Sequence, residues 1–115
     1  NELHKLKEKY TICFGEQKSF VDLKNKKPLR YDIFGFLYMS KGFLAPFVIE
    51  VDDKAHFIKK NNVHDIYKNY YCWINGFCLL RIDMEYNKKN DVNYGTIIKS
   101  FFDDIINKKQ LIHNS

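Results

Sequence analysis

Two acidic residues, Glu50 and Asp52, stand at the end of an apolar stretch that begins at Leu44. Successive side chains of a strand point to opposite faces, so a strand over 44–52 would place both carboxylates on one face. Neighbouring carboxylates raise one another's pKa, and burying one unpaired is costly, so such a pair usually shares a proton or binds a metal. Magnesium favours carboxylate oxygens and keeps water ligands for chemistry. The alternative is a strand end whose acids point into solvent.

A third carboxylate, Asp32, lies in the apolar and aromatic segment LRYDIFGFLY, residues 29–38. Pro28 cannot donate to a sheet, so we expect a strand to begin just after it. Strict alternation would put Asp32 on the same face as Arg30 and Phe34. The turn signal SKG at 40–42 joins this strand to the 44–52 strand as a hairpin. The hairpin is expected to bring Asp32 beside Glu50 and Asp52, so that three carboxylates converge.

The elements around this hairpin follow from periodicity and turn residues. A helix over 63–74 is predicted to pack Ile66, Tyr70 and Trp73 onto the sheet, and Gly76 suits the left-handed position after it. The segment 77–82, FCLLRI, is typical of an interior strand reached by a helical crossover. The remaining expectations are a helix over 2–9, strands over 10–14 and 19–23 with Gly15 closing the first, a polar loop over 84–95, and an amphipathic helix over 96–109 whose last turn holds Lys108 and Lys109.

Composition indicates one globular domain over residues 1–115, since 45% of the residues are hydrophobic. The formal net charge of +5 favours a polyanionic partner, although excess lysine also serves solubility. Three cysteines without a CxxC spacing are expected to be reduced and buried in an intracellular protein, cytoplasmic or nuclear. No apolar run is long enough for a membrane helix, so no membrane partner is expected. The chain begins with Asn1, which fits a domain excised from a longer chain.

Three stretches together resemble a known family: FVDLKNKKPLRYDIF at 20–34, FVIEVDDKAHF at 47–57 and DIYKNYYCWINGFCLLRI at 65–82. Their order and spacing are similar to the small Vsr-like nucleases of the PD-(D/E)xK superfamily, especially the EDxHD homing endonucleases. The resemblance implies an α/β fold of the restriction-endonuclease-like type, a mixed β-sheet flanked by helices. It also implies a DNA endonuclease that uses Mg²⁺, for which Mn²⁺ can substitute.

The resemblance assigns roles by position. Asp32, Glu50 and Asp52 match the metal-binding acids, His56 matches the histidine near the scissile phosphate, and Lys68 lies where some members bring a lysine from a helix. Arg30 and Arg81 would contact phosphates or carboxylates. Basic residues on two sides of the site would bind the DNA backbone; they are Lys24, Lys26, Lys27, Lys59 and Lys60.

Each assignment has a simpler alternative. His56 alone would be a surface or capping histidine, Lys68 a solvated helix residue, and each lysine cluster a solvated loop. One of the helix aromatics could stack on a base, but core packing is the more usual role.

The chain also departs from the family pattern. Asp52 stands where the superfamily usually has lysine, Asp53 stands where members commonly have glycine, and no residue before the first strand matches the family's helix acid well; the candidates are Glu2, Glu8 and Glu16. Two other classes of function therefore stay open, a catalytically silent nucleic-acid-binding module and a structural interaction module. Besides DNA, the expected partners are a second copy of the chain or a further domain of a longer chain.

Overall fold

The computed structural model describes residues 3, 10–25, 27–39, 44–52, 59–91, 93–107 and 112–114, and it leaves the side chains of 21–28, 59–62, 85, 86 and 112–114 without description. In this part of the chain, a five-stranded sheet runs in sequence order. Its strands are β1 (Ile12–Asn25), β2 (Lys27–Tyr38), β3 (Leu44–Asp52), β4 (Cys78–Asp83) and β5 (Ile112–Asn114). Neighbours are antiparallel from β1 to β3 and parallel from β3 to β5.

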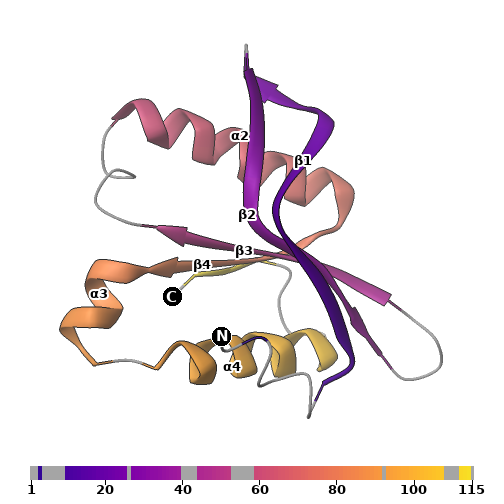
Figure 1. Cartoon of the computed structure of the whole chain (residues 1–115), viewed down its shortest axis with the longest axis vertical. Helices are drawn as coiled ribbons and strands as arrows, with labels where there is room; N and C mark the ends of the chain where they lie inside the picture. Colours follow the sequence, from indigo (N-terminus) through magenta and orange to yellow (C-terminus); the bar gives the residue numbers. More distant parts are fainter. Residues whose placement is uncertain are drawn as a thin grey trace.

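In the described residues, three helices accompany the sheet: α2 (Lys59–Asn75), α3 (Met84–Lys89) and α4 (Tyr94–Ile106). Helix α2 is the crossover between the parallel strands β3 and β4, as expected from the apolar run that follows Gly76. Figure 1 shows α2 on one side of β3 and β4 and α4 on the other. The protein is therefore an α/β domain with a mixed sheet flanked by helices. Among the described helices, none has the length and apolar character needed to cross a bilayer.

The apolar core lies on both faces of the sheet. Alternate residues of β3 and β4 point in opposite directions, and the two sets pack into separate clusters. Val48 and Leu79 pack with Tyr71 and Cys72 on the α2 side. The α4 side is built from the alternating strand residues and one stripe of the helix; it includes Phe47, Ile49, Leu80, Ile82, Ile98, Phe101, Phe102 and Ile105. Both faces of the central strands are thus covered, and β3 is fixed between two helical layers.

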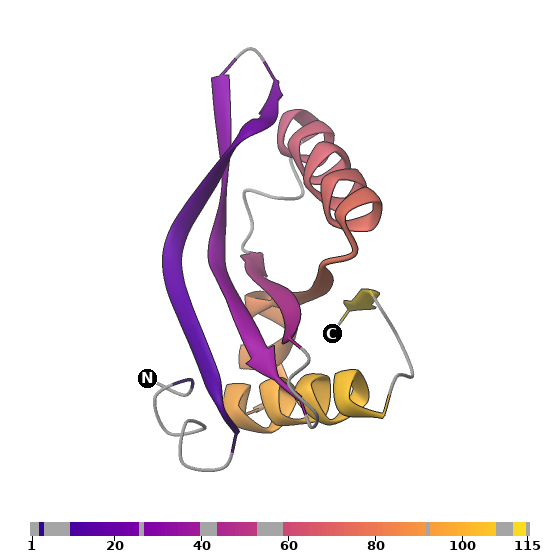
Figure 2. The ribbon, with the colours of Figure 1, turned by 90° about the vertical axis from the view of Figure 1, so that its right-hand side faces the viewer.

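Strands β1 and β2 form a long hairpin that runs along the molecule beside α2 and α4 (Figure 2). The prediction of two short strands, with Gly15 closing the first, was wrong, because β1 is continuous through Gly15. The register of β1 against β2 shifts between Ser19 and Lys24. Gln17 is irregular in its backbone, since its φ of 54° is rare for a residue with a side chain. Gly15 does not end the strand, since it is paired with Phe34 of β2 like its neighbours.

The helix ends agree only partly with expectation. Gly76 has a φ of +70° after α2, as predicted for a left-handed residue beyond a helix. Helix α4 begins at Tyr94 because the Asn93 side chain caps it, its Oδ1 accepting the Gly95 N–H at 2.7 Å. The expected loop over 84–95 contains α3, so that prediction was wrong for its first half. The predicted helix over 2–9 and residues Lys108 and Lys109 lie outside the described residues.

Helix α2 turns a different side to the sheet from the one predicted. Ile66, Tyr70 and Trp73 are all more than half exposed, whereas Tyr71 and Cys72 are buried. The inward side also carries Lys68 and Asn69, which contact residues of β3 and β4. The polar groups at the end of the sheet require polar partners, and these partners set the rotation of the helix.

Candidate active site

The candidate site lies where β2 and β3 part, a place that we call the strand fork. The regular pairing of these strands runs from Tyr38 opposite Leu44 to Ile33 opposite Ile49 and stops there. Beyond it, the Asp32 N–H donates to Glu50 Oε1 at 2.8 Å, and the Val51 N–H donates to Asp32 Oδ2 at 2.8 Å. Two carboxylates thus replace the backbone carbonyls that a continued ladder would supply.

Strand β2 changes the direction of its side chains at this point. Tyr31 and Phe34, three residues apart, both belong to the cluster on the α2 side, while Ile33 packs on the α4 side. The strict alternation expected over 29–38 was therefore wrong at Asp32. Gln17, which falls between the paired residues Glu16 and Lys18, is the matching irregularity in β1. A local break of this kind re-aims a side chain, as bulges do next to functional sites.

Lys68 brings a positive charge from α2 to the fork. Its Nζ lies 3.1 Å from Glu50 Oε2, and both side chains are largely withdrawn from solvent, at 13% and 1% exposed. The turn of helix that carries Lys68 is held to β2, because the Tyr31 hydroxyl donates to the Lys68 backbone carbonyl at 2.8 Å. Cys72 Sγ lies 3.3 Å from the same hydroxyl. Lys68, the helix residue that the family resemblance singled out, therefore lies against Glu50.

Burial raises the pKa of Glu50, and the nearby Asp32 carboxylate raises it further. The Lys68 ammonium and the hydrogen bond from Asp32 oppose this rise in the pKa but do not cancel it. A buried acid whose pKa is raised beside a second acid is a group that gains from a nearby cation, since a cation favours its charged form. The electrostatics of the fork therefore suit a bound cation.

Asp52, the third predicted acid, has a different partner. Arg81 of β4 places its Nη1 3.1 Å from Asp52 Oδ1 and 3.3 Å from Asp65 Oδ1 of α2. The same guanidinium donates from Nε and Nη2 to Asn69 Oδ1, at 2.9 and 2.8 Å. Within the described part of the chain, no three acidic, cysteine or histidine side chains gather where one metal ion could touch them all. The structure thus brings together two of the three carboxylates, Asp32 and Glu50.

The remaining predicted residues have separate outcomes. His56 and Lys26 lie outside the described residues. For Lys24, Lys27, Lys59 and Lys60 only the backbone is described, at the ends of β1, β2 and α2. Arg30 is exposed and sits between Leu29 and Tyr31, which face α2, so it points to the other side of β2. The sequence analysis missed Tyr31 and Asn69. Asn69 lies four residues after Asp65, which is the helical spacing that could have placed both beside Arg81.

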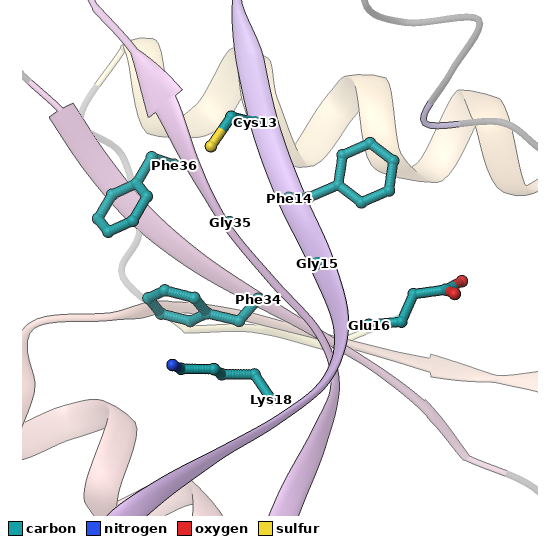
Figure 3. A pocket seen from close by; sticks show the side chains of 8 residues that line it. All are labelled: Cys13, Phe14, Gly15, Glu16, Lys18, Phe34, Gly35 and Phe36. Atoms are coloured by element: carbon teal, nitrogen blue, oxygen red, sulfur yellow. The ribbon is translucent and has the colours of Figure 1, made fainter.

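A shallow hollow of about 250 Å³ lies on the hairpin next to the fork. Figure 3 shows Cys13, Lys18, Phe34 and Phe36 projecting to one side of β1 and β2, with Phe14 and Glu16 on the other. The floor lacks side chains because Gly15 and Gly35 form it. Lys18 Nζ lies 5.2 Å from the centre of the Phe20 ring, so a cation stands at the rim of an aromatic surface.

Comparisons with family models, with curated proteins and with solved structures find no match for the chain. The chemistry of the fork must therefore be judged from its own geometry. That geometry offers two adjacent carboxylates, a buried ammonium and two backbone amides that hold the carboxylates in place.

Proposed function

We propose that this protein is a metal-dependent DNA endonuclease with a restriction-endonuclease-like fold. The strand fork is the observation that carries the proposal, because it joins Asp32, Glu50 and Lys68 at one place. The order of elements also supports it, since three antiparallel strands are followed by a helix and a parallel strand. The resemblance of 20–34, 47–57 and 65–82 to Vsr-like and EDxHD nucleases supplies the reaction class.

The residues of the fork fit a magnesium ion. Mg²⁺ typically binds through one or two carboxylates and keeps several waters, so Asp32 and Glu50 suffice as protein ligands. Each carboxylate oxygen has two lone pairs, and the hydrogen bonds from Asp32 N–H and Val51 N–H use only one on each acceptor. Bound magnesium would neutralise phosphate charge and lower the pKa of its water. Asp52 takes no part in this arrangement, because Arg81 engages it.

The protein's own groups have distinct tasks in this proposal. Asp32 and Glu50 hold the cation, and the two backbone amides keep the carboxylates oriented before substrate arrives. Lys68 supplies positive charge that attracts the phosphate and stabilises the charge that develops on it during hydrolysis. Tyr31 keeps the Lys68 turn of α2 in position. His56 is proposed to move the proton, as the family resemblance implies.

DNA is the proposed partner, with the duplex backbone contacted by basic residues around the fork. Lys18 is exposed at the adjoining hollow, and the lysines at 24, 26, 27, 59 and 60 extend this positive surface in sequence. Contacts between lysine and phosphate release counterions, so binding should weaken steeply as salt rises. The protein would act inside the cell, where DNA and reduced cysteines occur together.

A silent nucleic-acid-binding module is the second candidate. The Lys68–Glu50 ion pair favours it, since a buried pair can also be purely structural. Arg81 likewise forms an ion pair with Asp52, the acid that stands where the superfamily usually has lysine. Such a module would bind DNA in a salt-sensitive manner without cutting it.

Cleavage of supercoiled plasmid with Mg²⁺ or Mn²⁺, and with EDTA as the metal-free reference, tests the proposal. We expect Asp32→Asn and Glu50→Gln to cut about 100-fold more slowly or not at all. Asp52→Asn is the matched control on the same strand and should stay within about tenfold of the unmodified protein, because Asp52 is bound to Arg81. Folding of each variant is checked by circular dichroism.

Other outcomes would contradict the proposal. Cutting that persists in EDTA, or in Glu50→Gln, would show that the activity does not come from the fork. A folded protein that binds DNA and takes up Mn²⁺ but does not cut would favour the silent module. A greater loss in Asp52→Asn than in Asp32→Asn would move the metal away from the Asp32 and Glu50 pair.

A further inference from the structure

Helix α2 presents to solvent a continuous apolar stripe that no described element covers. Six large apolar side chains form it, and their exposed fractions range from 43% at Val63 to 66% at Trp73. The others are Ile66, Tyr67, Tyr70 and Ile74. We call this surface the α2 stripe. Soluble chains scatter such residues singly, so a continuous run along one helix indicates an interaction surface.

The α2 stripe has the spacing of a helix-packing seam. Val63, Ile66, Tyr70 and Trp73 follow one another at intervals of three, four and three, which is the pattern with which one helix packs against another. Tyr70 and Trp73 already contact each other, with ring centroids 6.1 Å apart. The side chains at these spacings form ridges along the helix, and the apolar side chains of a neighbouring helix would pack into the grooves between them.

Charge decides which partner fits the stripe. From Val63 to Asn75 the only acidic or basic residues of α2 are Asp65 and Lys68, apart from His64, and both are engaged on the inward side. The stripe therefore offers DNA no cation for its phosphates, which a nucleic-acid surface needs. Lys59 and Lys60 lie at the start of α2, before the stripe, and the last turn of α2 carries no basic residue. Two antiparallel copies of the stripe can therefore meet without bringing like charges together, even though the chain carries a net charge of +5.

The size of the stripe fits the same partner. From their exposed fractions, the six side chains present roughly 700 Å² per chain, and a standard protein interface buries about 800 Å² per partner. Tyrosine and tryptophan, three of the six residues, are also the types that contribute most binding energy at interfaces.

We propose that two copies of this protein form a symmetric dimer through the α2 stripe, with α2 packed against α2 of the partner. A two-fold dimer uses the same surface from each chain, so a self-complementary, uncharged helix face meets its requirement. Lys68 lies on the opposite side of this helix, so dimerisation would leave its contact with Glu50 intact. The proposal concerns association and does not depend on whether the fork cuts DNA.

Sedimentation of the full chain over a range of concentrations tests the dimer. We expect a mass twice the 13.8 kDa of one chain at micromolar concentrations. Trp73→Glu and Ile66→Glu should raise the dissociation constant of the dimer by at least about tenfold, because each places two like charges at the contact. Ile106→Glu is the control, since Ile106 is likewise a partly exposed apolar residue, at 43%, but lies on α4.

Cysteine substitutions locate the contact independently. In a Cys13→Ser background, at least one of Ile66→Cys, Tyr70→Cys and Trp73→Cys should form a disulfide between chains on mild oxidation, whereas Ile106→Cys should not. A folded protein that stays monomeric at about 100 µM would overturn the proposal. So would a dimer that the α2 substitutions leave unchanged.

Discussion

Gly35 lies where the sheet leaves no room for a side chain. A Cβ there would lie 2.7 Å from Phe47 Cζ and 2.8 Å from Phe14 Cβ, and it would also meet the Cys13 carbonyl oxygen. Gly15 lies in the same hollow, yet a Cβ there would meet nothing within 4 Å. We therefore expect Gly35→Ala to lower the free energy of unfolding by about 3 kcal/mol. Gly15→Ala should change it by less than about 1 kcal/mol.

Urea denaturation of both variants measures this difference. The pair forms its own control, because the two glycines belong to adjoining strands and the same substitution is made at each. Equal losses of stability would mean that the close approach of β1, β2 and Phe47 at Gly35 is not the cause.

The Cys72 thiol makes stability sensitive to alkaline pH. Burial raises its pKa to about 11, against an ordinary value of 9.0. Below pH 9 the thiol is protonated in both states, so its contribution to stability is fully present. Between pH 9 and 11 the unfolded thiol ionises while the folded one keeps its proton, and the free energy of unfolding should fall by about 2–3 kcal/mol.

The measurement is a set of urea denaturation curves from pH 8 to 11 under reducing conditions. Cys72→Ala is the comparison, because alanine does not ionise while the tyrosines and Cys78 titrate in both proteins. We expect a shallower decline in Cys72→Ala. Parallel declines in the two proteins would show that Cys72 does not contribute to the alkaline loss.

At the level of elements, helix α2 shows what a pattern of apolar residues can and cannot predict. Its sequence contains two stripes with helical spacing, the apolar α2 stripe and a polar one at 65, 68 and 69. Amphipathicity alone directs the apolar stripe inward, which is why that prediction was wrong. The polar stripe faces the sheet because Glu50 and Arg81 are there, and their need for partners is invisible without the tertiary arrangement.

The strands were more predictable than the helix rotation. The turn signal in the sequence at 40–42 correctly indicated the hairpin that brings Asp32 to Glu50. The expectation that the strand begins just after Pro28 was wrong, because β2 begins at Lys27 and Pro28 lies opposite Lys24. The continuous apolar run 77–82 correctly indicated an interior parallel strand. The change of side-chain direction at Asp32 was not predictable, because alternation assumes unbroken pairing and the strand fork depends on carboxylates that substitute for it.

Arg81 connects three elements, so its replacement should lower the stability of the whole fold. Its guanidinium contacts Asp52 of β3 and Asp65 and Asn69 of α2 from a position on β4. Arg81→Met removes that counter-charge from two carboxylates and should lower the free energy of unfolding by about 3 kcal/mol. Arg81→Lys, which keeps the charge but cannot donate to Asn69 from two nitrogens at fixed spacing, should lose less.

Chemical denaturation at several salt concentrations measures the free energy of unfolding of both Arg81 variants. The dependence of that free energy on salt separates the contribution of charge from that of packing. The deficit of Arg81→Met should shrink as salt rises, because salt screens the two carboxylates that lose their counter-charge. A deficit that is independent of salt would assign the role of Arg81 to packing of its alkyl chain.

For the whole molecule, the proposed nuclease activity would be limited in a monomer, because the described residues form one fork per chain. A single site hydrolyses one strand of a duplex, so nicked plasmid should appear before linear plasmid. If the dimer forms through the α2 stripe, linear product should rise with the square of protein concentration below the dissociation constant. Trp73→Glu should nick normally and yield little linear plasmid.

The ratio of nicked to linear product against concentration measures this behaviour, with Ile106→Glu as the control that should match the unmodified protein. Linear product that forms in proportion to concentration in a demonstrated monomer would contradict the expectation. So would a Trp73→Glu protein that linearises plasmid as fast as the control.

The reciprocal hydrogen bonds of the strand fork also give the molecule two internal reporters. The amides of Asp32 and Val51 donate directly to the Glu50 and Asp32 carboxylates, so their NMR resonances respond to whatever those carboxylates bind. Proton uptake by Glu50 would move the Asp32 resonance, and a cation shared by both acids would move the two resonances together. The occupancy of the fork can thus be followed by spectroscopy in the absence of DNA and of any turnover.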